Sequence, residues 1–555
     1  MIIGLDMGGT NIDAVIIKDN KILKTVKKPV DNKDILNSIL NVIETLLIDI
    51  NPKLIKKVNL STTISTNAVV LNKLNKVGLI IQTGPGLSKD FIITNNHTHF
   101  ISGYTDHRGV VVKEFKLEEI KKAMKDFDDN NIKDVLVVTK FSTRNNKTEL
   151  EIANILNNKY NVTLGHLMSG RLNFIRRINT AYLNAAVKPT FLTFSNAIKE
   201  ALKKLGVNAP INILKADSGV MDINYAETIP VETILSGPAA SLLGMIALND
   251  NDGDQILLDI GGTTTDIFFL ANNIPLFEPH GIEISNYKTL VRSIYSNSNP
   301  LGGDSLVKVL NNEIIIGPER LDKAYALGGK YPTPTDALIV LKRSEIGNYN
   351  KAIEGLYPLA RKLNLSVEQI AELIVDKFSK KVKEKVDEAL KIINSKPVYT
   401  IKEILNDKKI EPNHLFVIGA SAKAFSSSLE KTFNIKTNYP LNFEVANAIG
   451  AALAKTTSEI NLTYNAKSGL LTVPELGVNK NIDNLTLKDA KTYALKLLKK
   501  HNIDLGGSLD ESYEIFEESS FNMVDGFYTI GTNIRIRAQV KPGLTKRLGG
   551  LINEN

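Results

Sequence analysis

The sequence LDMGGTNID at residues 5–13 recurs as LDIGGTTTD at residues 258–266. Each copy continues into an apolar run, a polar turn and another apolar segment, so each predicts a strand, a glycine turn and a second strand. One acid-Gly-Gly-Thr turn on its own is typical of an ordinary hairpin. Two copies in the same frame indicate instead that the chain contains two duplicated halves.

The chemistry of this repeated frame suits a nucleoside triphosphate. Paired glycines let backbone N–H groups approach phosphate oxygens, and the side chains that follow donate further hydrogen bonds. Asp6 and Asp259 end their strands, where a carboxylate can hold Mg²⁺. Neither glycine pair continues into a Walker A or a G-x-G-x-x-G motif. We therefore expect ATP and Mg²⁺ between the loops, with phosphate contacts from Gly8, Gly9, Thr10, Asn11, Gly261, Gly262, Thr263 and Thr264.

Composition excludes several classes of protein. With 555 residues, 43% hydrophobic and 23% charged, the chain is long enough for three or four domain-sized units with a large core. Its apolar runs are too short to cross a membrane, its N-terminus does not read as a signal peptide, and it has no cysteine. We expect a cytoplasmic protein without membrane contact. The net charge of +8 comes from lysine pairs scattered among acids, so no nucleic-acid partner is expected.

Further motifs follow in a characteristic order: STTISTN at 61–67, GYTDHRG at 103–109, SGPAA at 236–240, GGDS at 302–305 and PTPTDA at 332–337. Together with both glycine loops, this order resembles the hydantoinase A and 5-oxoprolinase family. That family belongs to the superfamily of actin, sugar kinases and heat-shock ATPases. The resemblance implies an α/β fold with two ribonuclease-H-like halves, which enclose a nucleotide cleft.

The expected organisation has three parts. Residues 1–170 would form the N-terminal domain with the first loop, and residues 171–455 the core domain with the second loop. Residues 456–555 predict a small α+β appendage, in which a helix precedes a strand whose face carries Arg535, Arg537 and Lys541. Because no second large module follows, the resemblance implies a separate hydantoinase B-type subunit. The basic strand face is expected to meet an acidic surface of that partner.

Other elements of the nucleotide site are also expected. LFVIGASA at 415–422 predicts a strand that turns into a helix at Gly419 and Ala420, where the resemblance implies an adenosine-binding element. An ordinary strand-to-helix turn explains this segment equally well. Gly302 and Gly303 are expected to close on phosphate, with plain turn chemistry as the alternative. Small-residue helices at 180–186 and 446–452 are expected to cross at the hinge.

Two segments are candidates for substrate binding. Thr66 and Asn67 follow the carboxyl end of a predicted strand, which is where α/β folds form ligand crevices, although such residues also serve as helix caps. Asp106, His107 and Arg108 bring an acid, an imidazole and a cation together, which suits the orientation of a polar ring or proton transfer. A surface turn with a local ion pair explains this triplet equally well.

The resemblance implies an ATP-dependent hydrolase subunit that phosphorylates a lactam or cyclic imide so that water opens the ring. Asp6 and Asp259 would position metal and water, and Asp266 would orient the second loop. Three alternatives remain open: a ketone carboxylase subunit of the same family, a nucleotide-gated regulatory ATPase, and a sugar-kinase-like phosphotransferase.

Overall fold

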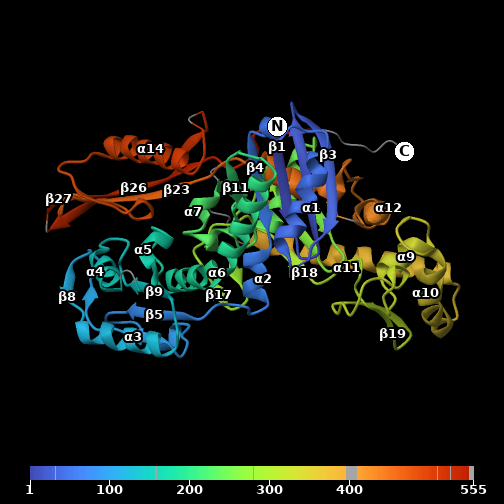
Figure 1. Ribbon diagram of the computed structural model, residues 1–555, viewed down its shortest axis with the longest axis horizontal. Coiled ribbons are helices and arrows are strands. Elements are labelled where there is room, and N and C mark those ends of the chain that lie inside the picture. The colour runs from blue at the N-terminus through green and yellow to red at the C-terminus, as the bar shows by residue number, and fades with distance from the viewer. Residues whose placement is uncertain are drawn as a thin grey trace.

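The computed structural model (Figure 1) describes residues 1–31, 33–156, 159–278, 280–395, 409–419, 421–508, 510–525 and 527–548. A central body carries the two termini of the described chain. A flanking domain and a C-terminal appendage lie one above the other at one end of this body, and a helical unit containing α9 and α10 lies at the other end. No helix within these ranges has the length and apolar character needed to cross a bilayer.

The first half of the body is a mixed sheet with the order β12-β11-β4-β1-β2-β3. Strands β1, β2 and β3 form an antiparallel meander, and β4 and β11 run parallel to β1. Apolar residues fill β1 and β2 and are buried on both faces of the sheet. The strands are Ile2–Met7 (β1), Asn11–Lys18 (β2), Lys21–Pro29 (β3), Lys57–Thr62 (β4), Ile211–Leu214 (β11) and Val220–Asp222 (β12).

The second half repeats the topology of β3, β2, β1, β4 and β11. Its order is β15-β14-β13-β21-β22, with β13, β14 and β15 antiparallel and β21 and β22 parallel to β13. Each half is therefore a ribonuclease-H-like sheet, and the duplication predicted from the two glycine turns is confirmed. The strands are Gln255–Ile260 (β13), Thr265–Ala271 (β14), Ile274–Pro275 (β15), His414–Ile418 (β21) and Thr437–Asn438 (β22), and β18 (Asn297–Asn299) adds to β14.

Helices cover both sheets. The first half contains α1 (Ile35–Leu47), α2 (Ile64–Val70), α6 (Phe174–Lys204) and α7 (Ile223–Ala226). The second contains α9 (Pro334–Val340), α10 (Tyr349–Leu363), α11 (Val367–Ser395) and α12 (Ala422–Phe433), with the hairpin of β19 (Val307–Leu310) and β20 (Glu313–Ile316). Between the halves lie α8 (Ser236–Ala247) and α13 (Ala446–Leu453), which share one apolar core with both sheets.

The helix that crosses α13 is α8, and the expected pairing with residues 180–186 is wrong. A β-carbon on Gly244 would lie 2.1 Å from the carbonyl oxygen of Ala446, and one on Gly450 would lie 2.2 Å from that of Ala240. These two glycines allow the helix backbones to meet. Residues 180–186 lie instead in α6, where the Thr180 hydroxyl accepts a hydrogen bond from the Leu290 amide at 2.9 Å.

The flanking domain is inserted between β4 and β11. Its parallel sheet has the order β10-β9-β5-β6, with strands Val77–Gln82 (β5), Thr98–Phe100 (β6), Asp134–Thr139 (β9) and Asn161–Leu164 (β10). It also holds α3 (Leu117–Asp129), α4 (Lys147–Leu156), α5 (Gly165–Met168) and the hairpin of β7 (Tyr104–Thr105) and β8 (Val111–Lys113). The first sheet therefore uses strands on both sides of residue 170.

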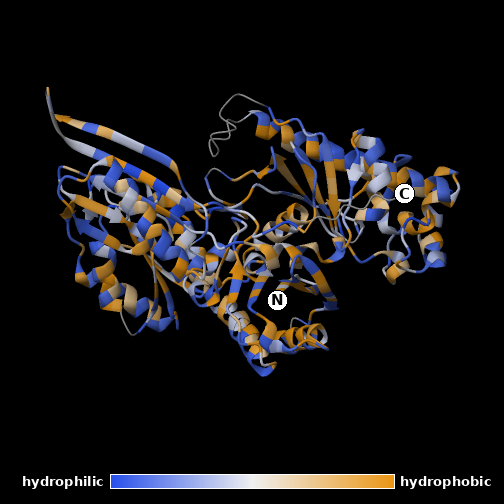
Figure 2. Ribbon diagram, turned by 90° about the horizontal axis from the view of Figure 1, so that it is seen from above, coloured by the Kyte–Doolittle hydropathy of each residue, from blue (hydrophilic) through white to orange (hydrophobic). Residues whose placement is uncertain are grey.

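The appendage is an antiparallel sheet of order β25-β24-β23-β27-β26, covered by α14 (Leu487–Asp504). Along β27, Ile534, Ile536, Ala538 and Val540 are buried in its core, as the alternation predicts. Figure 2 shows hydrophilic and hydrophobic residues alternating along the protruding hairpin. The remaining strands are Glu459–Asn465 (β23), Leu470–Val473 (β24), Val478–Asn481 (β25), Tyr513–Asp525 (β26) and Tyr528–Val540 (β27).

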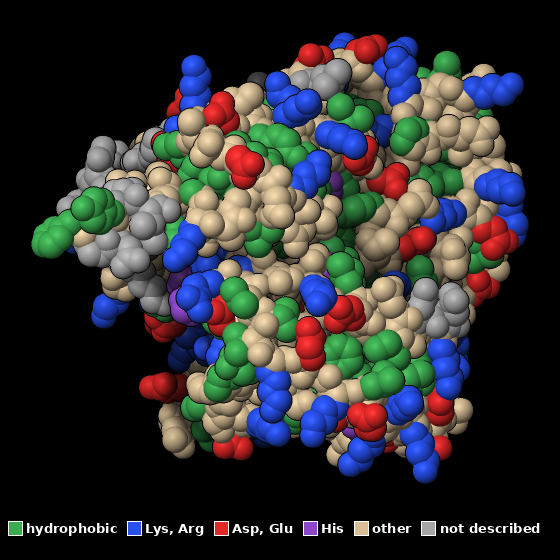
Figure 3. Space-filling model, turned by 90° about the vertical axis from the view of Figure 1, so that its left-hand side faces the viewer, with side chains coloured by type: hydrophobic (Ala, Val, Ile, Leu, Met, Phe, Trp, Pro, Cys, Tyr) green, Lys and Arg blue, Asp and Glu red, His purple; other side chains and the backbone are tan. Residues whose placement is uncertain are grey.

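The basic face of β27 is smaller than expected. Arg537 is only partly exposed, because its guanidinium pairs with Glu459 at 2.7 Å and with Glu517 at 2.7 Å. Arg535 and Lys541 are exposed. Figure 3 shows lysine and arginine interspersed with acidic side chains over this end of the molecule. Arg537 therefore lies on the predicted strand face, but its charge is already paired within the appendage.

Candidate nucleotide site

The two glycine turns have the same local geometry. In the first turn the Gly8 amide donates to the Asn11 carbonyl at 3.0 Å, and in the second the Gly261 amide donates to the Thr264 carbonyl at 3.0 Å. In each hairpin two aspartates lie directly opposite one another, Asp6 with Asp13 and Asp259 with Asp266. The sequence repeat therefore produces a repeated hairpin with the same register.

Burial divides each hairpin into an inner and an outer part. Asp6 is 6% exposed and Asp13 is 8% exposed. The turn residues Gly9, Thr10 and Thr263 are exposed at the tips. The hydroxyl groups and glycines that suit phosphate binding thus remain accessible, while carboxylates lie behind them.

Residues of the crossing helices hold the two strand-end aspartates. Asp6 accepts hydrogen bonds from the Ser61 hydroxyl, at the end of β4, and from the Asn447 amide of α13 at 3.3 Å. Asp259 accepts one from the Ser241 hydroxyl of α8 at 2.7 Å. The crossing of α8 and α13 therefore fixes the position of one aspartate relative to the other.

The electrostatics of this cluster suit a divalent cation. Burial raises the pKa of Asp6, and burial together with the neighbouring Asp6 raises the pKa of Asp259. Burial and the charge of Asp259 raise the pKa of Asp266 to about 7, and its Oδ1 atom is buried without a hydrogen-bond partner in the described chain. Asp13 has an ion pair with Lys27 at 2.9 Å.

A bound cation would stabilise these neighbouring carboxylates in their charged form. The described residues contain no group of three or more His, Cys, Asp or Glu side chains placed to hold a metal. Mg²⁺ usually binds proteins through one or two carboxylates together with substrate phosphates and water. Asp6 and Asp259 therefore fit Mg²⁺ that arrives with a nucleotide.

Two neighbouring glycines, Gly302 and Gly303, support the second turn. The Gly303 amide donates to the Gly261 carbonyl at 2.9 Å, and the Gly302 amide donates to the Ser305 hydroxyl at 2.9 Å. Both amides are thus already used, so in this structure the pair positions the turn. Direct contact of Gly302 and Gly303 with phosphate stays a prediction.

The predicted strand-to-helix turn is present between β21 and α12. Gly419 has φ +98°, and a β-carbon there would lie 2.8 Å from Oδ1 of Asp259, so glycine is needed for this close approach. Ala420 lies outside the described residues. Adenosine binding at this turn stays a prediction.

Thr66 and Asn67 lie beside the first turn. They belong to α2, which directly follows the carboxyl end of β4, as expected. The Thr66 hydroxyl accepts a hydrogen bond from the Leu235 amide at 2.8 Å, so it joins the helix to the start of α8. The Asn67 amide nitrogen would lie 3.8 Å from a β-carbon on Gly9. These two residues therefore adjoin the candidate nucleotide site.

Asp106, His107 and Arg108 form a separate surface turn between β7 and β8 of the flanking domain. Asp106 accepts from the Arg108 side chain at 2.9 Å and from the Val110 amide at 2.9 Å, and these bonds lower its pKa. His107 and Arg108 are exposed. The structure shows the local ion pair and does not join this triplet to Thr66 and Asn67.

Sequence reasoning missed Asn447 and Ser241 as residues that position the aspartates. Both lie in helices made largely of small or apolar residues, ANAIGAAL and SGPAASLLGMIA. A single polar side chain in such an apolar helix could have predicted this role, because a buried polar group needs a hydrogen-bond partner.

Two duplicated ribonuclease-H-like sheets, each with a glycine turn in its first hairpin, define the actin-like ATPase fold. Family models agree with this fold. The model described as hydantoinase/oxoprolinase matches residues 177–460, and that of the hydantoinase/oxoprolinase N-terminal region matches residues 2–160. The chain belongs to the hydantoinase/oxoprolinase family.

Several individual proteins are also similar to this chain. An uncharacterized protein of Methanocaldococcus jannaschii is 24% identical, with 92% of this chain and 81% of that protein aligned. The acetophenone carboxylase gamma subunit of Aromatoleum aromaticum is 22% identical over 61% of this chain and 53% of its own length. The structure of the ATP-dependent caprolactamase from Pseudomonas jessenii has a TM-score of 0.72 at 17% identity, covering 98% of this chain and 88% of that chain.

Proposed function

We propose that this protein is the ATP-using subunit of an enzyme that activates a lactam or cyclic imide for ring opening. The observation that carries the proposal is the pair of glycine turns with Asp6, which is buried, and Asp259, which is half-buried, on the strands that lead into them. Hydantoin and 5-oxoproline define the type of ring. The caprolactamase likeness supports the fold on which this chemistry would take place.

The chemical need for ATP follows from the substrate. An amide carbonyl is a poor electrophile, and transfer of a phosphoryl group to its oxygen creates a leaving group. ATP supplies that phosphoryl group when bound, and Asp6 and Asp259 would hold the accompanying Mg²⁺. Thr10, Asn11, Thr263 and Thr264 would contact phosphates from both turns. Thr66 and Asn67, beside the first turn, would contact the acceptor molecule.

Asp266 has a positioning role in this scheme. It faces Asp259 across the second hairpin and pairs in register with Ser298 of β18. Its partly protonated carboxyl would keep the charge behind Asp259 low until a cation binds. This role requires no contact with the substrate.

A ketone carboxylase subunit is the second candidate, favoured by the likeness to the acetophenone carboxylase gamma subunit. The same phosphoryl chemistry would then activate an enolate oxygen rather than an amide oxygen. That relative is itself a subunit, which supports a partner for the present chain. We propose a separate hydantoinase B-type subunit as that partner.

The test is a turnover assay of the full chain, alone and co-purified with the product of the neighbouring gene. ADP release and ring-opened product are measured with caprolactam, 5-oxoproline and hydantoin, and carboxylated product with acetone or acetophenone plus bicarbonate. We expect ATP-coupled ring opening that requires the second subunit and is lost in Asp259→Asn. Carboxylation without ring opening would select the second candidate, and ATP hydrolysis indifferent to every acceptor would refute both.

A further inference from the structure

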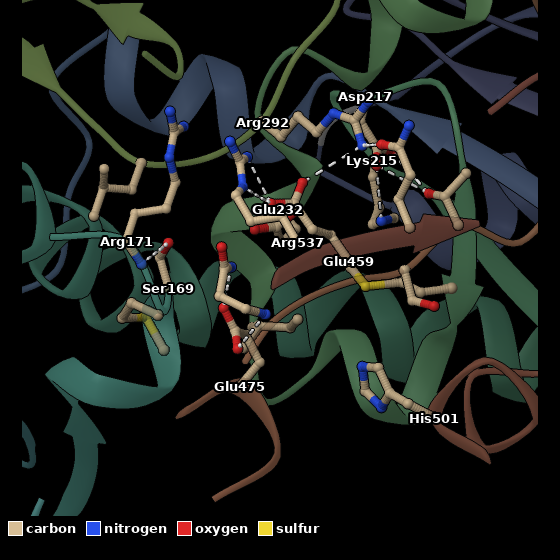
Figure 4. A pocket seen from close by; sticks show the side chains of 18 of the residues that line it. Ser169, Arg171, Lys215, Asp217, Glu232, Arg292, Glu459, Glu475, His501 and Arg537 are labelled. Atoms are coloured by element: carbon tan, nitrogen blue, oxygen red, sulfur yellow. Dashed lines mark hydrogen bonds and ion pairs between the residues drawn. The ribbon is translucent and has the colours of Figure 1, made fainter. Parts of the chain in front are cut away.

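A cavity of about 400 Å³ lies between the appendage and the body (Figure 4). Its walls include α5 and the residues that follow it, the turn between β11 and β12, residues 229–232 and 277–292, and strands β23, β26 and β27. This volume is in the range of small-molecule sites. The candidate nucleotide turns do not line the cavity.

Most charged groups in these walls have partners. Lys215 pairs with Asp217 at 3.1 Å, and Asp217 also accepts from the Thr457 hydroxyl at 3.0 Å. Arg537 donates to Glu459 at 2.7 Å and 3.1 Å. The bond from Thr457 to Asp217 joins the appendage to the body, and the ion pairs neutralise the charges concerned.

Glu232 is the exception. It lines the cavity, and its carboxyl has no hydrogen bond or ion pair within the described part of the chain. Burial raises its pKa to about 7, aided by the charges of Asp217 and Glu459 and opposed by those of Lys215 and Arg292. Glu232 is half-buried, and a carboxyl partly withdrawn from water is stabilised by a ligand that donates hydrogen bonds to it. Glu232 therefore marks one end of a binding site for a group that carries N–H donors.

Arginines mark a second wall of the same cavity. Arg171 follows α5 and lines the space together with Arg537 of the appendage. Burial and the positive charge of Arg537 lower the pKa of Arg171, while the charges of Glu459 and Glu517 act in the opposite direction. A carboxylate beside Arg171 would stabilise its charged form, and carboxylates suit guanidinium donors. Met168, Val231 and Phe277 provide apolar lining for a short hydrocarbon chain.

We propose that this cavity binds a small amino carboxylic acid, with its ammonium group at Glu232 and its carboxylate at Arg171. Such a zwitterion is the class of product that ring opening of a lactam gives, and this link alone rests on the proposed function. Next to Glu232, the buried Thr233 contacts α2, because its hydroxyl lies 2.8 Å from that of the buried Ser65.

The test uses the full chain without nucleotide or second subunit, so it stands apart from the activity assay. Calorimetric titrations at pH 7.5 compare 4-aminobutanoate, 5-aminopentanoate and 6-aminohexanoate with pentanoate and pentylamine, which lack one charged end. We expect at least one amino acid to bind about tenfold or more tightly than both single-ended molecules. Glu232→Gln should weaken that binding about tenfold or more, because it removes the charge on which the ammonium rests.

A matched control is Glu518→Gln, because Glu518 lies on β26 of the appendage but does not line the cavity. This variant should bind the amino acids as the wild type does. Circular dichroism melts confirm that both variants fold. No amino acid binding, equal binding of pentanoate or pentylamine, or unchanged affinity in Glu232→Gln would overturn the proposal. Binding without any ATP-coupled ring opening would keep the site and remove only its link to the product.

Discussion

Replacing Gly450 by alanine should force the two crossing helices apart. The added β-carbon would lie 2.2 Å from the carbonyl oxygen of Ala240 and 2.4 Å from the amide nitrogen of Gly244. Ordinary contacts at such a carbon begin at 3.4 Å, and the obstructing atoms are backbone. The helices must therefore separate by about 1 Å, since no side-chain rotation can clear the overlap.

This displacement sets the expected magnitudes. Overpacking costs about 1–3 kcal/mol, and alanine recovers about 1 kcal/mol over glycine through helix propensity. We expect the free energy of unfolding to fall by up to about 2 kcal/mol. Because Asn447 of α13 holds Asp6 and Ser241 of α8 holds Asp259, the same shift moves one aspartate relative to the other. A misplacement of about 1 Å can lower turnover about 100-fold.

The measurements are urea unfolding followed by circular dichroism, and ATP turnover at saturating nucleotide. Gly237→Ala in α8 is the stability control, because the nearest atom to its new β-carbon is a side-chain methyl of Thr63 at 3.2 Å. This control should change stability by less than about 1 kcal/mol. The variant Gly244→Ala combined with Gly450→Ala should lose less than the sum of the single losses, since both widen one crossing. A Gly450→Ala protein with wild-type stability and turnover would refute the reasoning.

Three further results are expected. Asp6→Asn and Asp259→Asn should each lower Mg²⁺-dependent ATP turnover about 100-fold with little change in melting temperature, and unchanged calorimetric affinity for Mg-ATP would contradict their metal role. Burial raises the pKa of Glu232 from 4.5 to about 7 in the folded protein, so the folded state binds more protons than the unfolded state between these values. The free energy of unfolding of the wild type, compared with that of Glu232→Gln, should therefore fall by up to about 3 kcal/mol as the pH rises from 4.5 to 8, as measured by urea titrations. Arg537→Ala should lower the free energy of unfolding by about 3 kcal/mol, because it breaks the ion pair with Glu459. Arg535→Ala, at an exposed position two residues away, should change it by less than about 0.5 kcal/mol. Equal effects of the two variants would show that the ion pair with Glu459 does not stabilise the fold.

The architecture of the body was predictable because its decisive information is local and repeated. The frame at residues 5–13 and 258–266 specifies a strand, a turn and a strand in each half, and the two hairpins have the same register. The start of α11 was also predictable. The sequence SVEQ at 366–369 has the pattern of a capping box, and Ser366 and Gln369 form its two reciprocal hydrogen bonds. Hydrogen bonds between residues so close in the chain can be recognised from a short sequence pattern.

The partner of α13 was not predictable from such patterns. SGPAA at 236–240 favours a turn because of its glycine and proline, yet it begins a buried helix. Which small-residue helix meets Gly450 depends on how the two sheets face each other. The amino-acid composition of residues 180–186 and of α8 does not distinguish these possibilities.

The cavity between the appendage and the body could not be predicted from the sequence either. Arg171, Glu232 and Arg537 come from three distant parts of the chain, and only the docking of the appendage brings them together. For the same reason the alternation along β27 predicted which residues are buried but not which charges are paired. Glu459, the partner of Arg537, lies on the neighbouring strand β23.

The close fit of α13 against β1 bears on how the chain folds. A β-carbon on Gly4 would lie 2.1 Å from the carbonyl oxygen of Ala448, so the first strand of the protein rests on a helix made more than 440 residues later. The same apolar core includes Val15 of the first sheet and Phe416 of the second. During synthesis, the N-terminal half must therefore wait with an uncovered apolar surface until α13 emerges. In the complete protein, neither half can unfold without exposing apolar surface of the other, because both contribute to this core.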